Sequence, residues 1–207
     1  MSRLAAYLAD RARDESGAVL IELAAVLGVF FLLVLGLIDF GRLGFAHVLG
    51  EKATERAVRM AVVRPPLCPD VDTVVRRSAL GLLQPGVTPG TRCADAPGVC
   101  RAPDPVSCTA ADAGAGADAI WDRVAPFLPA NAAPENLRFS YTWDPALNRL
   151  GAGYSPLVTV EITDLDFDFI SPLGALAAAA GADDADSLGA SLPFPSMSAS
   201  HPAEDLQ

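Results

Sequence analysis

The sequence contains only two histidines, His47 and His201, and no C-x-x-C pair. Zinc sites in small domains need several such ligands at short spacings, so a zinc centre is poorly supported. A Ser/His/Asp set, a nucleophile elbow and a phosphate-binding loop are not recognisable either. We therefore expect no enzyme activity and no cofactor, and we interpret His47 as a packing or interface residue.

Basic residues are few in the larger, C-terminal part of the chain. Residues 65–207 contain 7 Lys or Arg and 18 Asp or Glu, a net charge of −11. Residues 1–64 contain 8 and 7, respectively, and are nearly neutral. A strongly acidic domain is repelled by nucleic acid and by anionic lipid surfaces, so we do not expect nucleic acid as a partner. The simplest interpretation is that acidity keeps this domain soluble.

One apolar run dominates the N-terminal part. Residues 18–38 form 21 consecutive positions with a single charge, Glu22. About 20 apolar residues cross the hydrocarbon core of a bilayer as a helix. The run is longer than the roughly 7–15 apolar residues of a cleaved secretory signal, and no small-x-small site follows it. It therefore predicts a retained transmembrane helix.

The four cysteines, Cys68, Cys93, Cys100 and Cys108, all follow this run. An even number of cysteines in a Pro- and Gly-rich segment favours two disulfides in an oxidising compartment. This places the C-terminal side outside the cytoplasm and the N-terminus inside. Four cysteines allow three pairings, and the sequence does not choose among them. We favour Cys93 with Cys100 and Cys68 with Cys108.

The chain divides into four parts on this basis. Residues 1–17 form a short polar cytoplasmic leader, residues 18–38 the transmembrane helix, and residues 39–64 an extracytoplasmic continuation of that helix. No proline intervenes before Pro65, so one helix from Ala18 to Val63 would be about 69 Å long. Residues 65–207 form a disulfide-containing α+β domain.

Within this domain, the pattern predicts helices at 70–84, 118–128 and 172–186, and irregular structure over 85–116. Two segments, 137–143 and 157–169, alternate apolar and polar residues with the period of a half-buried strand. The loop between them favours an antiparallel pair. Residues 191–200 suggest a last edge strand because of their prolines, and the tail from His201 is expected to be exposed. The expected fold class is α+β, with a long N-terminal helix and a small antiparallel sheet.

Three further sets of residues are candidate sites. Small residues recur on one face of the helix after the span, and this face packs either on the sheet of the same chain or on a neighbouring helix: Ala46, Gly50, Ala53, Ala57 and Ala61. Asp164, Asp166 and Asp168 alternate, which suggests either a weak calcium site or a solvated strand face. Asp183, Asp184 and Asp186 are best explained as a solvated loop. Trp121, Trp143 and Phe127 are expected in the core.

Glu22 has two interpretations. At five residues past Gly17, about 7 Å along a helix axis, its carboxylate can reach the membrane interface and be tolerated there. Alternatively, the chain is cut after Gly17, and Ala18 becomes a charged N-terminus. Glu22 would then be the fifth residue of the mature chain and could pair with such an amine in a low-dielectric setting.

The stretch "GAVLIELAAVLGVFFLLVLGLIDFGR" (residues 17–42) resembles the N-terminus of TadE-like proteins, the pilin-like proteins of tight-adherence (Flp-type) pilus systems. Their hallmark is a Gly, a few small or apolar residues, a Glu, an apolar run and an acidic-Phe-Gly-Arg turn, here Asp39 to Arg42. The helical "EKATERAVRMAV" and the strand "LVTVEIT" followed by "FISPLG" also fit.

The resemblance implies a pseudopilin or minor pilin in the cell membrane, a single-pass protein with its N-terminus in the cytoplasm and its C-terminal domain outside. It implies cleavage by a prepilin peptidase between Gly17 and Ala18, the alternative being an uncut anchor. It assigns Glu22 to processing or assembly. The implied partners are the membrane, other pilin-like subunits and components of the pilus or of a related secretion apparatus. The runner-up function is a bitopic membrane protein whose acidic domain binds a ligand or calcium.

Overall fold

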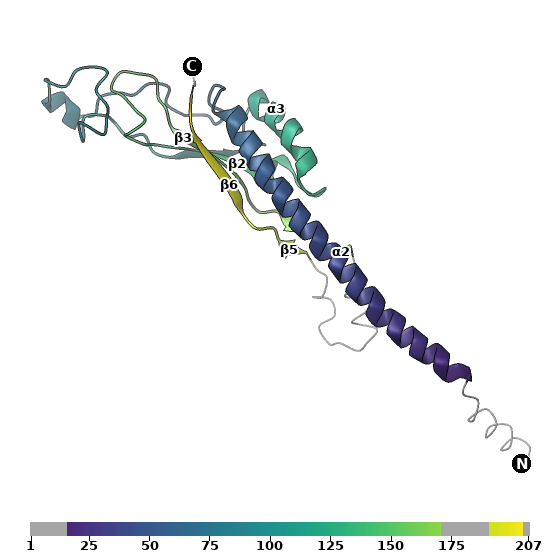
Figure 1. Cartoon of the computed structure of the whole chain (residues 1–207). Coiled ribbons are helices and arrows are strands. Elements are labelled where there is room, and N and C mark those ends of the chain that lie inside the picture. The colour runs from purple at the N-terminus through teal and green to yellow at the C-terminus, as the bar shows by residue number, and fades with distance from the viewer. Residues whose placement is uncertain (1–15, 171–190, 205–207) are drawn as a thin grey trace, which may run out of the picture. The chain divides into compact units, whose positions relative to one another are not determined.

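A single helix dominates the computed structural model, which describes residues 16–170 and 191–204. Helix α2 (Ser16–Ala61) is 46 residues long and is drawn in purple to blue in Figure 1. It ends at Ala61, two residues before the expected end at Val63. Gly28, Gly36 and Gly41 do not interrupt it, and the tetrapeptide Asp39–Arg42 is helical rather than a separate turn. The helix ends just before Pro65 and Pro66, which cannot continue it.

The chain folds as two compact units. Among the described residues, the first comprises residues 16–42 and 168–170, and the second comprises residues 43–167 and 191–204. Helix α2 thus contributes its N-terminal part to the first unit and its C-terminal part to the second. The long helix and the small antiparallel sheet confirm the expected α+β class.

The second unit is built on a four-stranded antiparallel sheet with the order β1-β2-β3-β6. Its strands are β1 (Val106–Thr109), β2 (Leu137–Thr142), β3 (Leu157–Ile162) and β6 (Met197–Pro202). The predicted antiparallel pair is β2 and β3, and Phe139 lies opposite Val160. Strand β6 forms an edge, as expected of this proline-containing segment. A second, two-stranded sheet pairs β4 (Asp166–Phe167) with β5 (Leu192–Pro193).

Alternation of side chains creates the core of this unit. Along β2, Leu137, Phe139 and Tyr141 are buried and the residues between them are half-buried, and β3 continues the pattern with Val158, Val160 and Ile162. Because partners in register share a face, these side chains form one apolar layer. Figure 1 shows the C-terminal part of α2 and helix α3 (Ala115–Val124) over the sheet. The core therefore lies between these helices and the sheet.

The helix expected over residues 70–84 is wrong. Only the short 3₁₀ helix η1 (Leu80–Leu83) forms there. The preceding residues are extended, because Val75 N–H donates to Ala152 O and Tyr154 N–H donates to Thr73 O, both at 2.9 Å. The run Thr73–Val75 is β-branched and suits such pairing, so backbone bonds to a distant loop overcome the helical spacing.

Other expectations were met in part. Strand β1 lies inside the segment expected to be irregular. Helix α3 and the 3₁₀ helix η2 (Ala125–Phe127) confirm the helical segment that was expected at 118–128. Trp121, Trp143 and Phe127 are only half-buried rather than core residues. The tail is not wholly exposed, since Ala203 is buried and Glu204 N–H donates to Val62 O. The expected helix at 172–186, including Asp183, Asp184 and Asp186, lies outside the described residues.

Candidate functional site on the N-terminal helix

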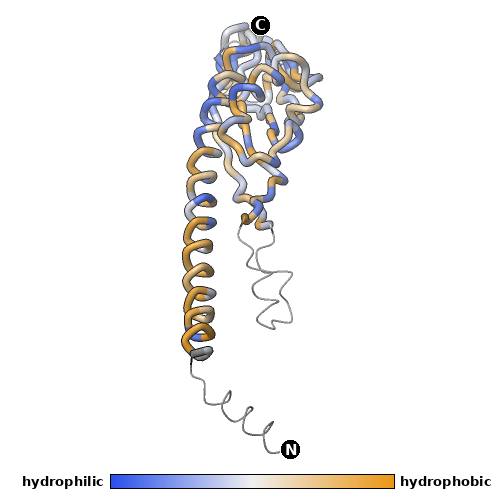
Figure 2. The backbone as a smooth tube through the Cα atoms, turned by 90° about the vertical axis from the view of Figure 1, so that its right-hand side faces the viewer, coloured by the Kyte–Doolittle hydropathy of each residue, from blue (hydrophilic) through white to orange (hydrophobic). Residues whose placement is uncertain are grey.

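The N-terminal part of α2 exposes apolar side chains around its circumference. Val19, Phe30 and Leu37 are 67%, 55% and 76% exposed, and Figure 2 shows this part of the helix almost entirely in orange. The chain contains one helix among the described residues that is long and apolar enough to cross a membrane, and its most apolar window is 0% buried. Soluble monomers rarely expose apolar patches of more than a few hundred Å². This part of the helix therefore has the properties of a membrane anchor.

Gly17 and Glu22 lie at the start of this surface. The described part of helix α2 starts at Ser16, so the bond between Gly17 and Ala18 lies within this helix, close to the first described residue. The Glu22 side chain is exposed. It projects from the helix more than one turn beyond Gly17 and is accessible to a second molecule.

Asp39 is a site residue that the sequence analysis did not single out by itself. Its side chain is only 2% exposed, and its Oδ1 accepts hydrogen bonds from Arg42 at 3.1 Å and from the Ile170 N–H at 3.2 Å. Next to it, the rings of Phe40 and Phe169 meet edge to face at 6.3 Å. These contacts fix residues 169–170 on the helix within the first unit. The only signal in the sequence is an Asp three residues before an Arg, at the end of the apolar run.

The small residues that follow the apolar run lie in the second unit and are mostly buried. Ala53, Ala57 and Ala61 are 0% exposed, Gly50 is buried and Ala46 is half-buried. A Cβ atom at Gly50 would lie 2.6 Å from the terminal methyl carbon of Met197 in β6. The structure thus places this face within its own chain, against the sheet. Close approach of this kind is what small side chains allow.

The remaining surface of the same helical segment is charged. Lys52 Nζ lies 3.0 Å from Glu55 Oε2, and this hydrogen bond and the Lys52 charge lower the pKa of Glu55. His47 Nε2 lies 3.7 Å from Glu51 Oε1. His47 Nδ1 is buried and has no hydrogen-bond partner in the part of the chain that the structure describes. This surface is that of a solvated helix rather than a metal site.

All four cysteines are paired in the second unit. Cys68 bonds to Cys108 and Cys93 to Cys100, the two pairs favoured from the sequence. The first bond ties the chain just after α2 to strand β1 in the sheet. The second closes a loop that packs, through Cys93, against Val75 and Tyr154.

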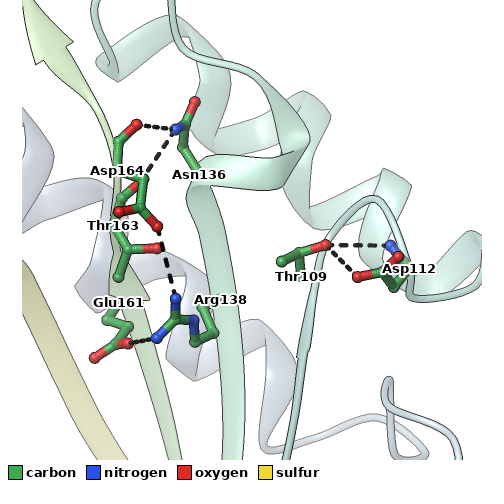
Figure 3. Close-up of polar contacts among 7 residues, drawn as sticks. All are labelled: Thr109, Asp112, Asn136, Arg138, Glu161, Thr163 and Asp164. Carbon is green, nitrogen blue, oxygen red and sulfur yellow. Dashed lines mark hydrogen bonds and ion pairs between the residues drawn. The ribbon is translucent and has the colours of Figure 1, made fainter.

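The three alternating aspartates do not form a common face. Strand β3 ends at Ile162, and Asp164 adopts a positive φ of 54°, which interrupts the alternation before Asp166. Asp164 instead lies 3.7 Å from Arg138, which also pairs with Glu161 at 3.1 Å (Figure 3). Asn136 donates to the backbone oxygen of Asp164 at 2.7 Å. Among the described residues, no group of three or more acidic, His or Cys side chains could hold a metal ion.

Comparison with known proteins supports the resemblance seen in the sequence. Residues 17–59 match the family model described as TadE-like protein. No curated protein and no solved structure matches the chain. The match confirms the TadE-like resemblance and covers α2 from Gly17 almost to its end.

Proposed function

We propose that the chain is a membrane-anchored, pilin-like protein that acts in the assembly of a tight-adherence (Flp-type) pilus or a related secretion apparatus. The observation that carries this proposal is the division of one helix into two surfaces. The N-terminal part of α2 exposes apolar side chains, whereas its C-terminal part buries one face of small residues against a sheet and exposes charged residues on the other. The TadE-like match spans both parts. The role is structural rather than enzymatic.

The orientation follows from the disulfides. Both lie in the second unit, and such bonds form and persist in oxidising compartments. The second unit therefore lies outside the cytoplasm, residues 18–38 cross the cell membrane, and the leader 1–17 remains in the cytoplasm. This topology presents the leader to a prepilin peptidase at the cytoplasmic surface.

Cleavage after Gly17 would create an N-terminal amine with which the Glu22 carboxylate could pair. The new amine at Ala18 is positively charged at neutral pH. The Glu22 carboxylate is exposed, so it can pair with the amine of a neighbouring subunit. Both charges are costly in lipid when alone, and pairing them offsets part of that cost. The pair would align subunits while they are still in the membrane.

Changing Glu22 tests this proposal. In cells that carry the complete pilus system, we expect Glu22→Gln to reduce pilus assembly and surface adherence strongly, because the amide keeps the shape but removes the charge. N-terminal sequencing of the membrane-extracted wild-type protein should start at Ala18. Glu135→Gln is the matched control, since Glu135 is also exposed but lies in the 3₁₀ helix η3 (Pro134–Asn136) of the second unit.

Two results would count against the proposal. A wild-type N-terminus at Met1 or Ser2 would show that the bond after Gly17 is not cleaved and that the protein is an uncut anchor. Normal processing, piliation and adherence with Glu22→Gln would remove the assembly role of this carboxylate.

A second candidate function is that of a bitopic protein whose acidic domain binds a ligand. The observation that favours it is a cavity in the second unit that is lined by acidic residues. None of the lining residues belongs to α2, so this candidate function does not depend on Gly17 or Glu22.

A further inference from the structure

A cavity of about 250 Å³ opens in the second unit between the segment that follows α2 and the beginning of the sheet. Three carboxylates line it, from Asp70, Asp72 and Asp104, and Arg101 lines it as well. Three negative charges against one positive charge leave an excess of two negative charges at the cavity. This excess attracts cations and repels anions.

The hydroxyl of Tyr154 is the least expected group in this cavity. The Tyr154 side chain lines the cavity and is only 5% exposed. No hydrogen bond to its hydroxyl forms among the described residues. The hydroxyl oxygen is not one of the fully enclosed side-chain atoms without a partner, so it opens onto the cavity. A ligand in the cavity can therefore reach this oxygen and supply a hydrogen-bond partner.

Tyr154 is held in place by its neighbours. Its ring stacks on Trp143 with centroids 5.8 Å apart and an interplanar angle of 19°. Burial, and then the nearby Asp72 carboxylate, raise the pKa of Tyr154 to about 12. The phenol is thus neutral at physiological pH, and its oxygen is available as an acceptor.

Tyr141 also lines the cavity, but its hydroxyl differs from that of Tyr154 in having a hydrogen-bond partner. Its hydroxyl accepts a hydrogen bond from the Leu67 N–H at 3.0 Å and so has a partner within the fold. Of these two tyrosine side chains, only Tyr154 has a hydroxyl without a partner in the described chain. The cavity therefore combines an uncompensated negative charge with a fixed, unused hydrogen-bond acceptor.

A metal ion is not the best occupant of this cavity, because of the arrangement of its acidic side chains and because of its size. No group of three described acidic, His or Cys side chains is arranged to hold a metal. The cavity is also larger than one bare ion, and it is close to the size of small-ligand pockets, which begin at about 300 Å³. An organic cation that donates several hydrogen bonds fits both the volume and the charge.

We propose that this cavity binds an ammonium or guanidinium group. The carboxylates of Asp70, Asp72 and Asp104 supply the attraction, and the Tyr154 hydroxyl accepts an N–H bond from the cation. Such a group comes either from a lysine or arginine side chain of another protein or from a free polyamine. This inference rests on the second candidate function and is independent of cleavage at Gly17 and of Glu22, so either can fail without the other.

Titration of the full-length protein in detergent micelles tests this inference. N-acetyl-arginine methylamide represents a protein side chain, putrescine represents a free amine, and N-acetyl-citrulline methylamide is an uncharged control of nearly the same shape. Since Trp143 stacks on Tyr154, tryptophan fluorescence reports occupancy of the cavity. We expect a saturable change with at least one of the cations and none with the citrulline compound. The cation that binds more tightly identifies the source of the group.

Two variants locate the site. Tyr154→Phe keeps the stacked ring but removes the hydroxyl, and we expect binding to weaken about fivefold, the effect of one hydrogen bond. Asp72→Asn should weaken it by a similar factor or more. Asp122→Asn, an exposed change on α3, is the matched control and should leave binding unchanged. Equal binding of the arginine and citrulline compounds, wild-type binding by both variants, or displacement by micromolar Ca²⁺ would overturn the inference.

Discussion

Two carboxylates on α2 lie in opposite environments. Glu22 is exposed on the apolar part of the helix, whereas Asp39 is buried and hydrogen-bonded to Arg42 and to the backbone of Ile170. A buried carboxylate with partners serves the fold of its own chain, because removing the partners would leave a costly charge. An exposed carboxylate on an apolar surface is free to serve another molecule. Asp39 therefore contributes to contacts within its own chain, and the exposure of Glu22 is what the proposed contact with another subunit requires.

The alkaline limit of stability should depend on Tyr154. Its pKa is raised from 10.0 to about 12, chiefly by burial, so the folded state retains the phenol proton more tightly than the unfolded state does. This contribution, about 1–3 kcal/mol, is fully present below pH 10 and is lost as pH rises through about 12. We expect Tyr154→Phe to show a smaller fall in free energy of unfolding between these pH values, measured by chemical denaturation in micelles.

Tyr141 provides an internal reference for this measurement. Burial raises its pKa too, and it is present in both proteins, so the difference between them reports Tyr154 alone. An identical loss of stability in the wild type and in Tyr154→Phe would contradict the assignment.

At the scale of elements, alternation was the most reliable signal. Strands β2 and β3 were predictable because one face of each is buried, which forces apolar residues to alternate with polar ones. Residues 70–84 were not, because their helical spacing competes with backbone pairing to residues 151–154, which lie far along the chain. Strand β1 was missed since it has only four residues, too few for a clear period.

The candidate sites also differ in how far the sequence alone can predict them. Gly17, Glu22 and the small residues after the span lie on one continuous helix, so their spacing is visible in the sequence. The cavity joins Asp72, Arg101 and Tyr154 from three separate segments. The hydrogen bond from Ile170 to Asp39 likewise joins residues 131 positions apart. Contacts of this range depend on the tertiary fold and have no periodic signature.

The packing of α2 on β6 should depend on the absence of a side chain at Gly50. We expect Gly50→Leu to lower the free energy of unfolding by about 1–3 kcal/mol, because Met197 and Phe194 must be displaced. Gly44→Leu on the same helix is the matched control, since a Cβ there meets no atom within 4 Å. Denaturant titration followed by circular dichroism compares them. Equal stability of the two variants would show that this face does not need close approach.

At the scale of the whole molecule, the two disulfides close loops of different length. Cys68 and Cys108 are 40 residues apart in sequence, whereas Cys93 and Cys100 are 7 apart. The entropy of loop closure predicts a stabilisation of about 4 kcal/mol for the first and about 2.5 kcal/mol for the second. We expect the Cys68→Ser/Cys108→Ser variant to lose more free energy of unfolding than the Cys93→Ser/Cys100→Ser variant, measured by denaturant titration.

If the Cys93→Ser/Cys100→Ser variant lost more free energy of unfolding, the short loop would stabilise the fold by a mechanism other than loop-closure entropy. Its disulfide packs against Val75 and Tyr154, so its loss would then act on that small core rather than on the unfolded chain. Binding of the cation probes to each variant would separate these effects, because Tyr154 lines the proposed site.

Strand β6 has a consequence for biosynthesis. It is the last of the described strands to leave the ribosome, yet it pairs with β3 along its whole length, and Glu204 beyond it bonds to the end of α2. The four-stranded sheet therefore cannot be completed until the end of the chain has been made, whereas the apolar part of α2 is synthesised first. Until residue 204 has emerged, β3 presents an unpaired edge, which is a template for aggregation. A chain truncated before Met197 would thus keep the apolar helix but expose β3 permanently as an unpaired edge, which makes it a target for aggregation and proteolysis.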